Sequence, residues 1–225
     1  MADTPGGQRH SVPLSADLVQ DPRERAERES LNALRQFDQG VEIIRQHVED
    51  GQPFRLRPSA VLGLHRVALD GLSLYAGNFR PAGIAIEGSV HEPIGAHMVP
   101  EAVEEMCDYV NESWASATAL HLAAYVMWRL NWIHPFADGN GRTSRILSYV
   151  VLCIRLGYLL PGTKTIPDQI TANRQPYFEA LDAADAACRD GQIDVTAMEA
   201  LLEDLLAAQL YSVVESAGGN VSDDS

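Results

Sequence analysis

Two long apolar segments constrain the fold of this chain more than any other feature. Residues 115–133, ASATALHLAAYVMWRLNWI, are apolar on nearly every side of a helix, and residues 146–160, ILSYVVLCIRLGYLL, repeat that pattern. A helix that is apolar all round has to be buried. Both segments are therefore predicted to be central helices, and the stretch 134–145 between them is held by two buried elements.

The rest of the chain also carries mostly helical periodicity. Asp21 and Pro22 form a cap and first-turn pair, and apolar residues then recur every three or four positions. One stretch differs, because residues 84–91 alternate apolar positions around a Gly-Ser turn, which is typical of a hairpin. The predicted fold class is all-α, a helical bundle with a small β-hairpin. Further helices are predicted over 58–71, 99–114, 168–191 and 195–216.

The chain is predicted to form one domain with two tails. Its 225 residues are enough for one well-filled core, and both ends are rich in Gly, Ser and Asp without sustained periodicity. The expected division is a disordered tail at 1–20, a helical segment at 21–54, a core domain at 55–190, a C-terminal helix at 191–215 and a second disordered tail at 216–225.

Composition excludes several classes of function. A formal net charge of -14 argues against a nucleic-acid partner, since phosphate neutralisation needs a basic surface. Lys164 is the only lysine, so the GxxxxGK[ST] phosphate loop is absent. The 3 cysteines lie far apart, which suggests neither a disulfide framework nor a CxxC metal site. With no signal-peptide pattern and no apolar run of roughly 18 residues, we expect a cytoplasmic protein without a membrane partner.

The stretch HPFADGNGRTSR at 134–145 reads as a phosphate cradle without lysine. Gly139, Asn140 and Gly141 lie where a loop enters the second central helix, so backbone N–H groups and the positive end of the helix dipole can converge on one anion. Arg142 and Arg145 are three positions apart in the first turns, and both can point toward the same polyanion.

A base and a metal ligand accompany this cradle. Asp138 can hold Mg²⁺ that bridges phosphate oxygens, since this ion commonly takes one or two carboxylates plus substrate oxygens. His134 is the nearby group that takes a proton near neutral pH. Each element alone is more often structural, but a base, a metal ligand and an anion clamp between two buried helices together indicate a functional site.

The stretch 134–145 resembles the Fic family signature HPFx(D/E)GNGRxxR at every specified position. AGNFRPAG at 76–83 and NRQPYFEAL at 173–181 are also similar to Fic-domain features, and the resemblance covers roughly residues 55–190. It implies a Fic-type helical bundle that transfers AMP from ATP to a Ser, Thr or Tyr hydroxyl of a target protein and releases pyrophosphate.

The resemblance also implies a role for each motif residue. His134 would take the proton of the attacking hydroxyl, and Asp138 would bind Mg²⁺ across the α- and β-phosphates. The remaining implied ligands are Gly139, Asn140 and Gly141 as the anion hole, Arg142 for the β-phosphate and Arg145 for the γ-phosphate.

Outside the motif, the resemblance implies a flap and a nucleobase site. The hairpin at 84–91 would pair with an extended segment of the target. Tyr177 would lie near adenine and Ile86 on its other side, although a core role for Tyr177 and a surface role for Ile86 stay open. ATP and a target protein are the implied partners; a second copy of the chain and an antitoxin stay open.

An inhibitory glutamate is a further implication of the resemblance. Many Fic proteins carry [S/T]xxxE[G/N] on a helix whose glutamate pairs with the second motif arginine. The stretch 21–36 departs from that pattern, and Glu29 is the candidate, expected to pair with Arg145. Alternative functions are a non-catalytic nucleotide-binding module and AMP removal, which would depend on Glu29; Gly141, where Doc-like chains resemble GNKR, argues against phosphorylation.

Overall fold

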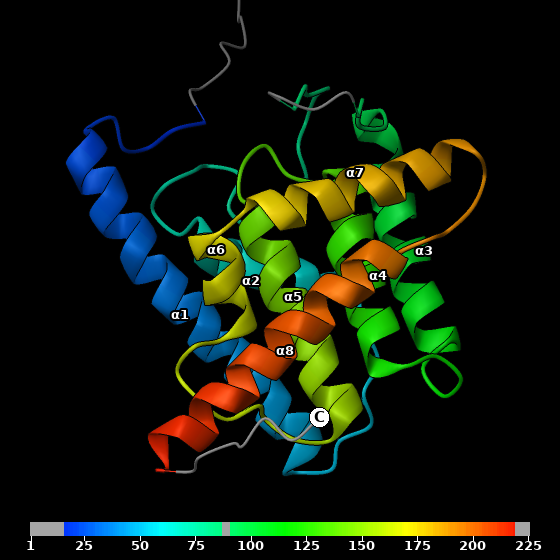
Figure 1. Cartoon of the computed structure of the whole chain (residues 1–225). Coiled ribbons are helices and arrows are strands. Elements are labelled where there is room, and N and C mark those ends of the chain that lie inside the picture. Colours follow the sequence, from blue (N-terminus) through cyan, green and yellow to red (C-terminus); the bar gives the residue numbers. More distant parts are fainter. Residues whose placement is uncertain (1–15, 87–90, 219–225) are drawn as a thin grey trace, which may run out of the picture.

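The computed structural model describes residues 16–86 and 91–218. Within these ranges the chain forms eight α-helices and one short 3-10 helix, with no named strand, which confirms the predicted all-α class (Figure 1). None of the helices in these ranges is long and apolar enough to cross a membrane. The helices are α1 (Pro22–Val48), α2 (Pro58–Ala68), η1 (Ala96–Met98), α3 (Val99–Glu112), α4 (Ala119–Ile133), α5 (Asn140–Leu156), α6 (Ile166–Ala172), α7 (Gln175–Arg189) and α8 (Thr196–Ser216).

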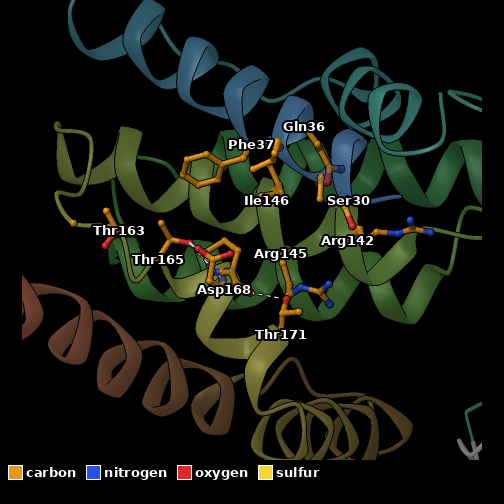
Figure 2. Close-up of a pocket in the computed structure, with 14 residues that line it drawn as sticks. Ser30, Gln36, Phe37, Arg142, Arg145, Ile146, Thr163, Thr165, Asp168 and Thr171 are labelled. Carbon is orange, nitrogen blue, oxygen red and sulfur yellow. Dashed lines mark hydrogen bonds between the residues drawn. The ribbon is translucent and has the colours of Figure 1, made fainter. Parts of the chain in front are cut away.

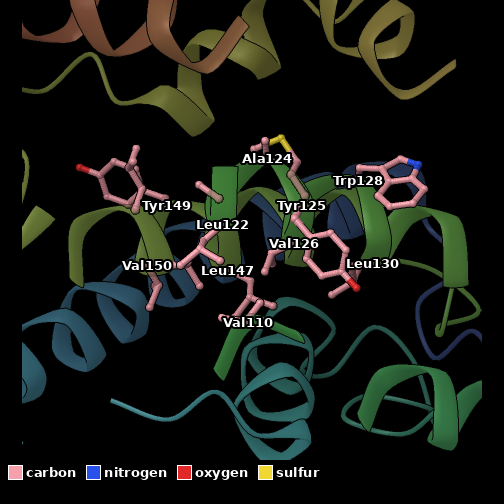
Figure 3. Packing of buried hydrophobic residues seen from close by; sticks show 14 of the residues in the cluster. Val110, Leu122, Ala124, Tyr125, Val126, Trp128, Leu130, Leu147, Tyr149 and Val150 are labelled. Atoms are coloured by element: carbon pink, nitrogen blue, oxygen red, sulfur yellow. The ribbon is translucent and has the colours of Figure 1, made fainter. Parts of the chain in front are cut away.

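The two apolar segments form α4 and α5, which pack on each other at the centre of the molecule (Figure 1). Thr118 caps α4 by accepting a hydrogen bond from the N–H of His121 at 3.0 Å. Helix α5 ends at Leu156 rather than at 160, because Gly157 adopts a left-handed conformation with φ 84°. Side chains from both helices fill the core, Leu122, Val126 and Leu147 among them (Figure 3).

Helix α1 begins where the sequence predicts, with the Asp21 carboxylate accepting hydrogen bonds from the N–H groups of Arg23 and Glu24. It packs on α2 and α5 (Figure 1). Gly40 allows the close approach to α5, because a Cβ there would lie 3.1 Å from Cγ2 of Ile146. This approach places the first turns of α1 beside the start of α5.

The C-terminal half of the chain covers the other side of the central pair. The stretch 168–191, predicted as one helix, divides into α6 and α7 around Asn173, whose backbone is extended. Helix α8 packs on α4, α6 and α7. The indole N–H of Trp128 on α4 donates to Asp185 on α7 at 2.8 Å, which ties α7 to the centre of the molecule.

The predicted hairpin at 84–91 is not seen in the described part of the chain. Residues 84–86 form no strand, and the turn at 87–90 lies outside the described residues. A two-stranded hairpin has little stability by itself. The backbone pairing that does occur lies elsewhere, where the N–H of Leu18 donates to the Leu72 carbonyl at 3.0 Å and Asp17 bridges Ser73.

Candidate functional site

The motif loop joins the end of α4 to the start of α5. His134 is the C-cap of α4 and has left-handed backbone angles, φ 50° and ψ 58°; no other non-glycine residue in the described ranges has positive φ. Gly139, the N-cap of α5, has φ 82°, and a Cβ there would lie 2.5 Å from Cδ2 of Leu69. Only glycine fits at that position.

Asn140 makes the loop rigid. Its Oδ1 accepts from the N–H of Phe136 at 2.9 Å, and its Nδ2 donates to the Phe136 carbonyl at 2.8 Å. Phe136 is fully buried and stacks on His65 with 3.6 Å between ring centroids. The side chain of Asn140 is thus occupied within the loop, which leaves its backbone N–H as its means of contributing to an anion hole.

The N-terminus of α5 is open to an anion. No side chain caps this helix, and its first helical hydrogen bond runs from the N–H of Thr143 to the Gly139 carbonyl at 2.9 Å. The N–H groups of the preceding positions have no partner within the helix. Donors of this kind at a helix start, with the helix dipole behind them, favour a phosphate.

The imidazole of His134 is set up to accept a proton. Its Nδ1 lies 3.3 Å from the carbonyl oxygen of Asn131, and because a carbonyl only accepts, Nδ1 carries the hydrogen and Nε2 is the acceptor. Burial lowers the pKa of His134, and the positive charge of Arg80 adds to this effect, which the Asn131 carbonyl opposes. The neutral form therefore prevails at neutral pH.

His134 and two of the predicted anion-binding residues line one cavity of about 530 Å³, whereas Gly139 and Arg142 line the neighbouring cavity of about 580 Å³. Gly141 and Arg145 lie on the wall of the 530 Å³ cavity, and so do Ile86 and Tyr177, the candidates for contact with adenine. Tyr177 is 2 % exposed, and its hydroxyl lies 3.4 Å from Oγ of Ser144, so it belongs to the core and to the cavity wall at once. Residues predicted to bind phosphate and residues predicted to contact adenine thus line the same cavity.

The two motif arginines project from the first turns of α5, with Ser30 of α1 and Thr171 of α6 near them (Figure 2). Arg145 lines the 530 Å³ cavity and also two neighbouring ones of about 450 and 580 Å³. Burial lowers the pKa of Arg145, an effect that Tyr177 opposes. Arg142 is less buried and pairs with Asp138, Nη2 to Oδ2, at 2.9 Å.

Asp138 fits the role of a magnesium ligand. Its side chain is 46 % exposed at the start of α5; Oδ1 accepts from the N–H of Gly139 at 2.6 Å, and Oδ2 contacts Arg25 at 3.1 Å. The described residues contain no group of three His, Cys, Asp or Glu side chains suited to a metal. One carboxylate with phosphate oxygens from a nucleotide is the kind of set that Mg²⁺ accepts.

Glu29 lies on the phosphate side of the site but has other partners than expected. Its carboxylate pairs with Arg25 at 3.3 Å and with Arg142 at 3.6 Å, whereas among the described residues Arg145 forms no ion pair. Helix α1 passes over the first turn of α5, which brings Arg142 closer to Glu29. Glu29 and Arg145 line the same 580 Å³ cavity, so their side chains still face one space.

Sequence reasoning missed two residues that hold the loop. His65 donates from Nε2 to the Asp138 carbonyl at 3.0 Å and accepts the N–H of Gly77 on Nδ1 at 3.0 Å. Arg25 pairs with Asp138 across 113 positions of sequence. No local pattern marks either residue, because both contacts depend on how α1 and α2 pack against α5.

Comparison with known proteins shows that part of this chain is similar to Fic proteins. The family model described as Fic/DOC family matches residues 55–152. "Protein adenylyltransferase Fic" of Drosophila willistoni is 35% identical over 126 residues, which cover 55% of this chain and 24% of the relative. "Protein adenylyltransferase fic-1" of Caenorhabditis elegans is 30% identical over 100 residues, covering 44% and 19%. The chain thus matches about a quarter or less of the length of these relatives.

Solved structures share the fold. A Fic domain containing signaling protein from Bacteroides thetaiotaomicron superposes with a TM-score of 0.66 at 22% identity, covering 85% of this chain and 74% of that one. Fic-1 from C. elegans gives a TM-score of 0.64 at 21% identity, covering 86% and 52%. Residues 55–152, which contain the 134–145 motif, thus match the Fic/DOC family, and the helical fold of the chain is that of solved Fic domains.

Proposed function

We propose that this protein is a protein adenylyltransferase, which transfers AMP from ATP to a hydroxyl of a target protein. The observation that carries the proposal is that a neutral imidazole with a free Nε2 acceptor, His134, shares one cavity with Gly141 and Arg145 at the open start of α5. The relatives named protein adenylyltransferase support the same assignment.

The nucleotide lies along the 530 Å³ cavity in this proposal. Its phosphates face the N–H groups at the start of α5 and the guanidinium groups of Arg142 and Arg145, which suit phosphate oxygens through charge-assisted hydrogen bonds. Its adenine lies between Ile86 and Tyr177, which both line this cavity. This orientation leaves the α-phosphorus nearest to His134.

The reaction forms one bond and breaks one. The oxygen of the target hydroxyl attacks the α-phosphorus, while its proton moves to Nε2 of His134. The bond between the α-phosphorus and the oxygen that bridges to the β-phosphorus breaks, and pyrophosphate leaves. The N–H groups at the start of α5 stabilise the negative charge that grows on the phosphate oxygens.

Asp138 is the residue that would hold Mg²⁺. When bound there, the ion would supply positive charge across the phosphates. The same carboxylate pairs with Arg25 and Arg142 through Oδ2. A metal ion that binds Oδ2 would therefore have to displace one or both guanidinium groups. Arg142 would then be released toward the phosphates.

Labelled ATP tests the proposal directly. The protein is incubated with a cell lysate, Mg²⁺ and ATP labelled either at the α- or at the γ-phosphate, beside the His134→Ala variant. Adenylyl transfer predicts a protein band labelled from the α-position only, and no band with the variant. A band from γ-labelled ATP would indicate phosphorylation instead, and nucleotide binding without any labelled band would indicate a non-catalytic module.

A further inference from the structure

Arg80 is a buried cation whose guanidinium contacts only backbone carbonyl groups among the described residues. It is 3 % exposed; Nε donates to the His134 carbonyl at 2.7 Å, Nη1 to the Ala82 carbonyl at 2.9 Å, and Nη2 to the Ile94 carbonyl. Burial lowers the pKa of Arg80, and among the described residues no carboxylate pairs with it. Burial of a guanidinium is costly, and the three carbonyl contacts offset that cost here.

The first of these carbonyls belongs to the proposed base. His134 has φ 50°, a conformation that a non-glycine residue keeps only when its surroundings hold it there. Arg80 binds the His134 carbonyl through its side chain, and its backbone N–H donates to the Pro135 carbonyl at 2.8 Å. Two consecutive peptide groups after the imidazole are thus fixed by one residue.

The other two carbonyls belong to residues near Ile86 and His91 in the chain. Ala82 and Ile94 stand on either side of Ile86 and His91, which line the 530 Å³ cavity together with His134. A single planar guanidinium therefore connects His134 to Ala82, which precedes Ile86 in the chain, and to Ile94, which follows His91. Arginine suits this role because its five donors form a rigid fork, whereas lysine carries one compact ammonium group.

We propose that Arg80 is a positioning residue of this site, which holds the imidazole of His134 in place relative to the cavity residues Ile86 and His91. The inference deepens the proposed adenylyl transfer and rests on it. Arg80 acts through His134, since its side-chain nitrogens are turned to carbonyl oxygens rather than to the cavity.

The test compares R80K in the full chain with R57K, a matched change at an exposed arginine before α2. We expect R80K to lower kcat for transfer by about 10- to 100-fold, the range for displacing a reacting group by about 1 Å, with the Kd for ATP changed less than about three-fold. R57K should match the wild type. In an H134A background R80K should cause no further loss, because the group that it positions is gone.

Transfer by R80K at the wild-type rate would overturn the inference. So would a loss from R80K in the H134A background as large as its loss in the wild-type background, and so would failure of R80K to fold. The imidazole NMR signal of His134, assigned by its disappearance in H134A, gives a readout that needs no transfer. R80K should shift that signal, and an unshifted signal would also contradict the inference. If R80K shifts the signal but the wild-type protein labels no target, the result would count against the proposed function alone.

Discussion

The proposed base, His134, can accept a proton only while its imidazole is neutral, and its surroundings favour that form. Burial lowers its pKa from the ordinary 6.5, and the Asn131 carbonyl fixes the hydrogen on Nδ1. The pH dependence of kcat/KM reports the pKa of the base in the free enzyme. We therefore expect kcat/KM for transfer to decrease as the pH is lowered, with a midpoint below about pH 6.5. A fall centred above that pH would contradict the assignment.

Removal of the base gives a second prediction at this scale. His134→Ala should lower transfer by about 10² to 10⁴, the usual effect of losing a positioned general base. ATP binding should stay nearly intact, because the phosphate-binding groups lie on α5. Rates from single-turnover labelling and Kd values from calorimetry separate the two effects, and equal transfer by variant and wild type would refute the role.

His65 makes stability depend on pH. Its folded-state pKa is lowered from 6.5 to about 4 by burial, so its contribution is present above pH 6.5 and is lost as pH falls toward 4. From about pH 7 to pH 5 the wild type should lose about 2 kcal/mol of unfolding free energy through this group. His65→Gln, which keeps a donor for the Asp138 carbonyl, should lack that loss in urea titrations. Parallel curves for both proteins would contradict this.

At the scale of elements, α1 lies against the start of α5 and contacts two motif residues. Its first turns place Arg25 on Asp138 and Glu29 on Arg142, so the helix engages the metal ligand and the phosphate clamp together. The family resemblance implies an inhibitory glutamate that pairs with the second motif arginine, Arg145. In this structure the candidate glutamate, Glu29, pairs with Arg142 instead. A γ-phosphate and the Glu29 carboxylate would share one cavity, and their charges repel.

Removing the charge of Glu29 should free Arg142 to bind phosphate. Glu29→Gln should tighten ATP by up to about five-fold, the value of a partly exposed ion pair of at most about 1 kcal/mol. AMP should gain less, because it has no β- and γ-phosphates. Glu27→Gln, an exposed neighbour on the same helix, is the matched control. The effect should vanish in an Arg142→Ala background, and its persistence there would mean that Glu29 acts through another group.

At the scale of the whole molecule, the site is the place where the most buried helices meet. Helix α4 ends at the proposed base, His134, and α5 begins after Gly139 in the proposed anion-binding turn. Because the two helices share one packed core, that core holds both ends of the motif loop in place (Figure 3). Helix α1 covers one side of this junction and α7 the other (Figure 1). Changes in how α1 docks should therefore reach the site.

Gly40 offers a test of that docking. Gly40→Leu should destabilise the protein by about 1–3 kcal/mol in urea unfolding, because added atoms meet Ile146 and Val150 of α5. Asp38→Leu, at an exposed position of the same helix, should stay within about 0.5 kcal/mol. An equal effect of both changes would show that α1 is not closely packed at Gly40.

The sequence by itself determined the helices and the local geometry of the motif. Apolar residues three or four positions apart reveal a buried helix face, and the glycines and arginines of 134–145 act through neighbours in the chain, so α4, α5 and the turn between them follow from local rules. The tertiary structure decided the partners of Glu29 and the contacts of His65 and Arg80 with the motif loop. Those contacts join residues far apart in sequence, and their distances depend on how whole helices pack, a property that no local pattern of residues encodes.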